Sequence, residues 1–147
     1  MNLKLITLLF IGVWIGMLLG ISFVEAPLKF RAPNITLPLG LGIGRLVFAA
    51  LNKFEIGFSL VIGIWLFQQF KSINFSLKVG LTLPILLVLL QTVWLIPILD
   101  VRAEQIIQGV DIEKSIHHLL YIVFEVVKLL LLLFCFLKVY RYEGHLG

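Results

Sequence analysis

Long apolar runs separated by short polar stretches divide this chain. A hydrophobic run of about 20 residues can cross a bilayer as a helix. The runs at 5–24, 55–70, 77–99 and 112–140 predict four such spans. The connections between them are too short for a second folded module, so we expect one domain over residues 1–147. The pattern predicts an all-α, integral membrane four-helix bundle.

The stretch 40–53 lies between a proline-containing loop and the second span. Its apolar residues fall on one helical face, whereas Arg45 and Lys53 fall elsewhere. This pattern is typical of a helix that lies in the membrane interface. We therefore expect an interfacial amphipathic helix after the first span.

Composition strengthens the membrane assignment. Hydrophobic residues make up 61% of the chain, and its mean hydropathy is +1.10. The net charge is +4, but the basic residues stand mostly at the ends of the spans, where they anchor and orient helices. We expect the lipid bilayer as the surroundings and no nucleic-acid partner. Lys4, before the first span, favours cytoplasmic termini, and we expect a bacterial inner-membrane location.

A polar stripe follows the last span. Its members recur at alternating steps of three and four, which places them on one helical face: Asp111, Lys114, His118, Tyr121, Glu125 and Lys128. Asp111 is a candidate N-cap, so the first turns would stand outside the bilayer. Glu125 and Lys128 lie deeper, where charges are expensive and usually face the interior of a bundle or a wet cavity. Gln91, inside the third span, is a candidate hydrogen-bond partner.

Two interpretations of this seam (His118, Tyr121, Glu125, Lys128 and Gln91) stay open. Glu125 and Lys128 are three residues apart and can form a purely structural ion pair. Alternatively, the seam is a proton or cation site in which Glu125 titrates, Lys128 tunes it and His118 stands at the mouth. A solvated polar rim surrounds either version: Glu25, Arg45, Asp100, Arg102 and Glu104.

Cofactor signals are weak. His118 with Glu125 and a carboxylate from another segment is a candidate metal site, but the spacing lacks an HExxH or CxxC motif. The remaining histidine on another segment, His145, lies in the tail, which disfavours a bis-histidine haem. The single cysteine, Cys135, excludes a multi-cysteine metal site. The sequence specifies no cofactor and no catalytic residue, and enzyme activity is not favoured.

Glycines mark one face of the first span. Gly12, Gly16 and Gly20 form two overlapping GxxxG patterns, which let another helix approach closely. Packing inside the same bundle is the simpler reading. A homo-oligomer or other membrane subunits are the alternative partners of this face. The tryptophans, Trp14 among them, are assigned to interface belts or packing.

The stretches Gly20–Phe30 and Gly44–Phe48, together with His118 near the start of the last span, resemble a known family. It is the family of small four-span membrane proteins that includes transmembrane protein 205. The family has small or polar residues three and seven positions after that histidine, where this chain has Tyr121 and Glu125. The resemblance implies a four-span fold. It also implies a link with metal-drug and copper handling, without a defined chemistry.

Three classes of function remain. The first is a small protein that binds or transports a proton, a metal ion or a small solute at the polar seam. The second is a structural or accessory subunit of a larger membrane complex. The third, which the sequence favours least, is a membrane oxidoreductase built around His118, Tyr121 and Glu125.

Overall fold

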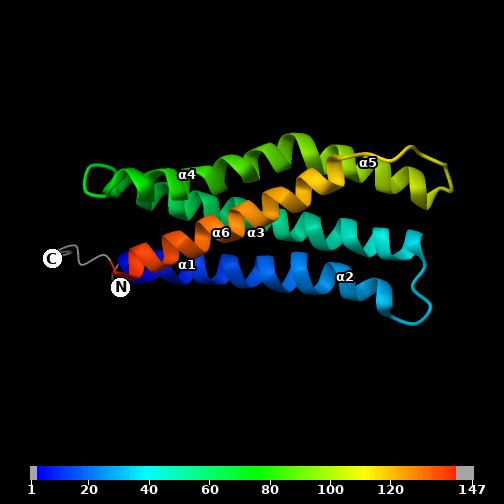
Figure 1. Ribbon diagram of the computed structural model, residues 1–147, viewed down its shortest axis with the longest axis horizontal. Helices are drawn as coiled ribbons and strands as arrows, with labels where there is room; N and C mark the ends of the chain where they lie inside the picture. The colour runs from blue at the N-terminus through cyan, green and yellow to red at the C-terminus, as the bar shows by residue number, and fades with distance from the viewer. Residues whose placement is uncertain (1–2, 142–147) are drawn as a thin grey trace.

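The computed structural model describes residues 3–141, which form four long helical stretches running antiparallel (Figure 1). The first stretch comprises α1 (Leu3–Met17), the π-helix η1 (Leu18–Glu25), α2 (Ala26–Leu28) and the 3₁₀ turn η2 (Lys29–Arg31). The second is α3 (Leu37–Gln69), and the fourth is α6 (His117–Arg141). The third comprises α4 (Phe75–Leu90), the π-helix η3 (Gln91–Leu95) and α5 (Ile96–Ile107). Each stretch is long and apolar enough to cross a membrane. The expected all-α four-helix membrane bundle is confirmed within these residues.

The second helix differs from the expectation. α3 is one helix of 33 residues, so residues 40–53 continue directly into the second span and do not form a separate interfacial helix. The helix begins early because Thr36 caps it, accepting a hydrogen bond from the backbone N–H of Leu39, and because Pro38 sits in its first turn. No further proline interrupts the chain between Pro38 and Gln69.

The last helix is shorter than expected. α6 begins at His117, and residues 110–115 form an extended connection. Asp111 and Lys114 therefore do not share a helical face with the rest of the stripe, and Asp111 does not cap α6. The preceding helix α5 ends at Ile107, and Gly109 follows with φ of +79°, a left-handed conformation that glycine adopts without a steric penalty.

Two prolines are accommodated by π-helical turns. Pro27 follows η1 and lies in the first turn of α2, whereas Pro97 follows η3 and lies in the first turn of α5. Proline removes a backbone donor and its ring clashes with the carbonyl four residues earlier in a regular helix. The wider π-turn relieves that clash, so both helical stretches continue past their prolines.

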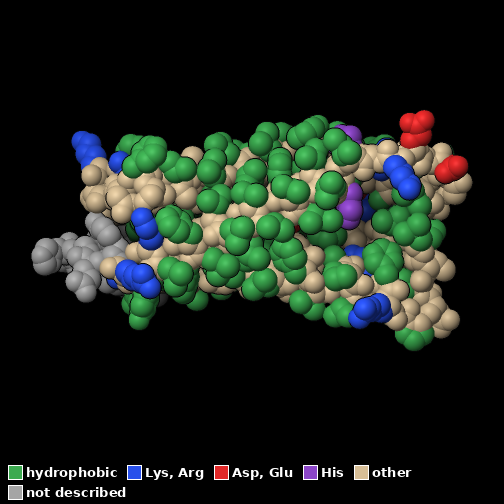
Figure 2. Space-filling view, viewed as in Figure 1, with side chains coloured by type: hydrophobic (Ala, Val, Ile, Leu, Met, Phe, Trp, Pro, Cys, Tyr) green, Lys and Arg blue, Asp and Glu red, His purple; other side chains and the backbone are tan. Residues whose placement is uncertain are grey.

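The apolar core lies among α1, α3, α4 and α6. Ile11, Trp14, Leu51, Val88 and Leu132 are each fully buried within it. α6 crosses the bundle diagonally and packs against α4 and α1 (Figure 1). Figure 2 shows hydrophobic side chains over the middle of the visible face, Lys and Arg toward both ends, and acidic side chains only at the end that carries the α5–α6 connection.

The helices are longer than a bilayer requires. A helix of 33 residues extends about 50 Å, whereas the hydrocarbon layer is about 30 Å thick and matches about 20 residues. Lys71, Lys78 and Lys138 mark the basic end of the bundle. Counting about 20 residues inward from that end places the other boundary near Pro97 and His118. The helix ends beyond that boundary project into the interface and the water.

Close helix packing uses a different glycine from those expected. A Cβ atom at Gly80 of α4 would lie 2.6 Å from the Cys135 Sγ of α6, so only glycine fits there. At Gly12 the nearest atom, on the Phe136 ring, would be 3.6 Å away, which is ordinary contact. At Gly16 and Gly20 a Cβ would meet nothing within 4 Å. These two glycines therefore do not receive another helix of the bundle.

We expect Gly80→Ala to lower the free energy of unfolding in detergent by about 1–3 kcal/mol, because it overpacks the α4–α6 contact. Adding Cys135→Ala should restore much of the loss by removing the sulfur atom in the way. Gly20→Ala is the matched control and should not destabilise. Equal stability of the Gly80 and Gly20 variants would contradict the packing described for α4 and α6.

Candidate functional site

Three charged side chains meet inside the bundle. Glu55 of α3 and Glu125 and Lys128 of α6 are each at most 1% exposed, and we call them the charge cluster. Lys128 Nζ lies 2.7 Å from Glu125 Oε1 and also contacts Glu55 Oε1. Trp14 Nε1 of α1 donates a hydrogen bond of 2.9 Å to the same Glu55 oxygen. One ammonium therefore lies between two carboxylates.

Two further helices hold Glu125. Ser22 Oγ of η1 donates to Glu125 Oε2 at 2.7 Å, and Gln91 Nε2 at the start of η3 donates to Glu125 Oε1 at 2.8 Å. Both donors lie in the π-helical turns. π-Turns are frequent at functional sites because the extra residue shifts the side chains that follow onto a different face. All four helical stretches thus contribute polar atoms to one buried layer.

A second polar pair lies beside this layer. The amide Nδ2 of Asn52 donates to Thr92 Oγ1 at 2.9 Å, and Thr92 also bonds the carbonyl of Val88 at 2.7 Å. Asn52, Glu55 and Ser59 are all buried and follow one another at helical steps of three and four. α3 therefore carries its own polar seam opposite that of α6.

Two buried polar atoms near the charge cluster have no hydrogen-bond partner among the described residues. They are the hydroxyl of Tyr121 and the Oε1 of Gln91. Tyr121 is 5% exposed, and its ring packs edge-on against Phe48 at 5.4 Å between centroids. A buried polar group without a partner costs about 1–3 kcal/mol, and the Tyr121 hydroxyl reduces that cost by lying beside the Glu125 carboxylate.

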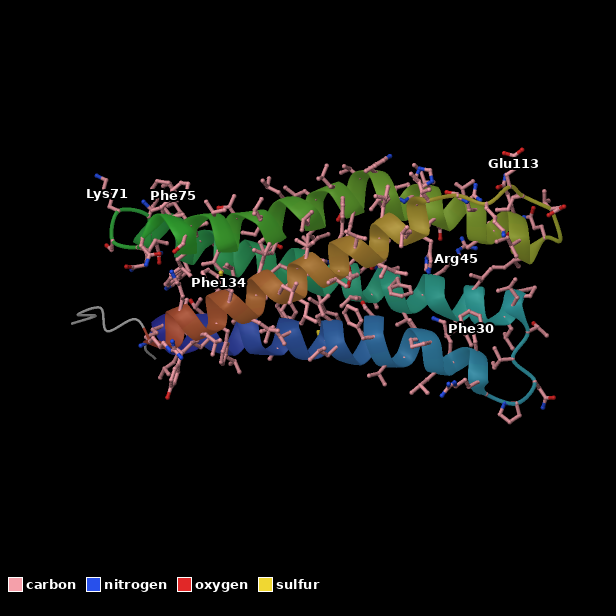
Figure 3. All side chains as sticks on the ribbon, in the orientation of Figure 1. Phe30, Arg45, Lys71, Phe75, Glu113 and Phe134 are labelled. Carbon is pink, nitrogen blue, oxygen red and sulfur yellow. The ribbon has the colours of Figure 1, made fainter. Side chains whose placement is uncertain are left out.

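A cavity of about 730 Å³ adjoins the charge cluster. It lies between α2, the first half of α3, α5 and the start of α6. Ser22, Tyr121 and Glu125 form its inner end, and its walls are mainly apolar, with several aromatic rings. Figure 3 shows Phe30 between α2 and α3 and Arg45 between α3 and α5. The cavity therefore leads from the end of the bundle that carries the α5–α6 connection to one carboxylate of the cluster.

The rim residues form ion pairs around this cavity. Arg45 binds Asp100 in a bidentate manner, at 2.6 Å through Nε and 3.0 Å through Nη2, and its Nη1 contacts Glu104. Lys29 pairs with Glu25 at 3.4 Å. These pairs lie on the outer side of the estimated hydrocarbon boundary. Partly solvated pairs of this kind add little stability, so they chiefly set the charge of the cavity mouth.

The structure brings together Gln91, Tyr121, Glu125 and Lys128 from the predicted seam. His118 is exposed and lines the cavity farther out. Among residues 3–141 no group of three His, Cys, Asp or Glu side chains could hold a metal ion. The metal site predicted at His118 stays a prediction. Arg102 donates to the backbone carbonyl of Glu113 and not to a rim carboxylate.

Sequence reasoning missed three members of the site. The sequence pattern predicts Glu55 at the boundary of a span and Trp14 in a belt or in packing, and it predicts no role for Ser22. The step from Asn52 to Glu55 to Ser59 is a polar stripe like that of α6. It becomes visible once residues 40–69 are read as one helix, which the sequence pattern did not suggest.

Comparisons with models of protein families, with curated proteins and with solved structures found no match.

Lys128→Met tests the role of the central ammonium. The variant leaves Glu55 and Glu125 side by side without a cation, and breaking such a buried pair costs about 3–5 kcal/mol. We expect that loss in the free energy of unfolding in detergent near neutral pH, with a smaller loss in acid, where the carboxyl groups are neutral. Lys53→Met, which removes an exposed lysine of α3, should have little effect. A Lys128→Met variant as stable as Lys53→Met would contradict the arrangement.

Proposed function

We propose that this integral membrane protein binds a proton at its buried carboxylates and uses the adjoining cavity to bind or carry a small solute. The observation that carries the proposal is the charge count of the cluster. Two carboxylates share one ammonium, and no other Lys or Arg among the described residues forms an ion pair with either carboxylate. Fully ionised, the cluster would hold one uncompensated negative charge away from water, and such a charge is costly.

One proton removes that excess charge. Both carboxylates contact the same Lys128 ammonium, so a proton on either one removes the excess charge of the cluster. Their surroundings differ, however. Glu55 is held between Trp14 and Lys128, whereas Glu125 borders the cavity beside Ser22 and Tyr121. We therefore assign Glu55 and Lys128 the role of a structural ion pair. Glu125, which borders the cavity, is the carboxyl that exchanges the proton.

Infrared spectroscopy of the purified protein near neutral pH tests the proton count. We expect a carboxylic acid C=O band in the wild type, because one cluster carboxyl is neutral whereas solvent-exposed carboxyls are ionised. Glu125→Gln and Glu55→Gln should each abolish the band. In either variant the remaining carboxylate and the Lys128 ammonium balance each other's charge, so no carboxyl needs to hold a proton. Lys128→Met should strengthen it, because both carboxyls then take up protons.

Glu113→Gln is the control for these variants, since Glu113 is exposed in the α5–α6 connection; its band should equal that of the wild type. A wild-type spectrum without an acid band would mean that both carboxylates are ionised, and the proposed proton site would then be rejected.

We further propose that both termini face the cytoplasm and that the membrane is a bacterial inner membrane. Support comes from Lys4, just before the first span, because the first helix usually dominates the orientation. Lys71, Lys78, Lys138 and Arg141 stand at the end near the termini, where no described residue is acidic. The opposite end carries mixed charge. Basic residues close to span ends favour the cytoplasmic side.

Cysteine labelling tests this orientation. The native Cys135 is fully buried, so an impermeant thiol reagent should report only an introduced cysteine. In intact cells we expect Glu113→Cys to react and Lys71→Cys to react only after the membrane is opened. The reverse pattern would place the termini outside.

A further inference from the structure

We propose that the cavity binds a lipophilic organic cation, which replaces the proton at Glu125. This inference rests on the proposed function, because the same carboxylate would serve both ligands. It identifies the small solute by its charge and its apolar character. Three features of the cavity carry it: the balance of charge, the chemistry of the walls, and the Tyr121 hydroxyl beside Glu125.

The balance of charge favours a cation. Arg45 is already neutralised by Asp100 and Glu104, and Lys29 is paired with Glu25. Arg102 stands at the mouth, where water and salt screen its charge. The charge cluster at the inner end has two carboxylates for one ammonium, so its uncompensated charge is negative. An anion would therefore meet no unpaired cation at the inner end, whereas a cation would compensate Glu125.

The walls favour an organic body over a hydrated inorganic ion. Phe23, Phe30, Phe48 and Tyr121 line the cavity together with aliphatic side chains. Aromatic faces attract cations, and Lys29 Nζ already lies 5.2 Å from the centre of the Phe48 ring and 5.7 Å from that of Phe30. A volume of about 730 Å³ falls within the range of about 300–1,000 Å³ that is typical of sites for drug-sized ligands.

The Tyr121 hydroxyl lies beside the Glu125 carboxylate on the same wall and makes no hydrogen bond of normal geometry. It is a polar atom, nine-tenths buried or more, at the inner end of a mainly apolar cavity. A few well-placed polar groups in an apolar pocket fix the orientation of a ligand. The hydroxyl can accept a hydrogen bond from an N–H of the bound cation or turn its oxygen toward the positive charge.

The exchange is balanced in charge and atoms. The neutral Glu125 carboxyl loses one proton to water, and the resulting carboxylate accepts the organic cation. No bond other than the O–H bond is broken. The cation therefore competes with the proton, and its affinity should rise with pH by up to about tenfold per unit of pH while the carboxyl is protonated in the unbound protein.

A pair of ions of the same shape tests this proposal. Tetraphenylphosphonium is a lipophilic cation and tetraphenylborate its anionic counterpart, so their difference reports charge alone. We expect calorimetry on the detergent-solubilised full chain to show saturable binding of the phosphonium, tighter at alkaline than at acidic pH, with one proton released per bound cation. Tetraphenylborate should bind at least about tenfold more weakly, since it lacks the ion pair with Glu125.

Glu125→Gln should weaken phosphonium binding at least about tenfold and remove its pH dependence, whereas Glu113→Gln should retain both. The comparison of the phosphonium with the borate in the wild type tests the preference for a cation even if Glu125→Gln fails to fold. Tight binding of the borate, or phosphonium binding that ignores pH, would overturn the inference. An infrared acid band without phosphonium binding would reject the organic cation alone, whereas absence of the band would reject the proton site itself.

Discussion

The pairing of one buried ammonium with two buried carboxylates is the constraint on which the rest of this structure depends. Lys128 cannot leave the low-dielectric interior without abandoning Glu55 and Glu125, and either carboxylate alone would be a costly buried charge. The groups that satisfy the two carboxylates come from all four helical stretches, with Trp14, Ser22 and Gln91 as donors. The helices must therefore close around the charge cluster in one arrangement. In lipid, where apolar surfaces gain little by meeting one another, such polar contacts specify which helix faces turn inward.

The local irregularities of the helices serve this arrangement. Ser22 and Gln91 both belong to π-helical turns, and each turn directly precedes a proline, whose ring crowds the carbonyl four residues earlier in a regular helix. The same turns thus carry the helix past the proline and place a donor on Glu125. Beyond them α2, the first half of α3 and α5 enclose the cavity. Its inner end is polar because the charge cluster is there, whereas aromatic and aliphatic side chains make its walls mainly apolar.

The residues of the buried site were predictable from the sequence to different degrees. Tyr121, Glu125 and Lys128 follow a clear three–four periodicity, and the structure buries all three. Glu55 escaped prediction because the glycine-rich stretch before it suggested a separate helix, which placed the residue at a span boundary. The π-turns, and with them the role of Ser22, also left no signal, since widening of a helix depends on what the neighbouring helices require. Gly80 became a close-packing site through the position of Cys135, on a helix far away in the sequence.

The sequence by itself determined that this is a four-span helical membrane protein and that the charged groups of its last helix share one helical face. Both follow from local physics, because hydropathy and helical period are properties of consecutive residues. Only the tertiary structure decided that Glu55 completes the charge cluster, that Trp14 donates to it, and that His118 stands apart from it. Those facts depend on the relative rotation and crossing of helices. Rotation and crossing arise from packing and hydrogen bonds between residues distant in the chain, such as Ser22 and Glu125, which are 103 positions apart.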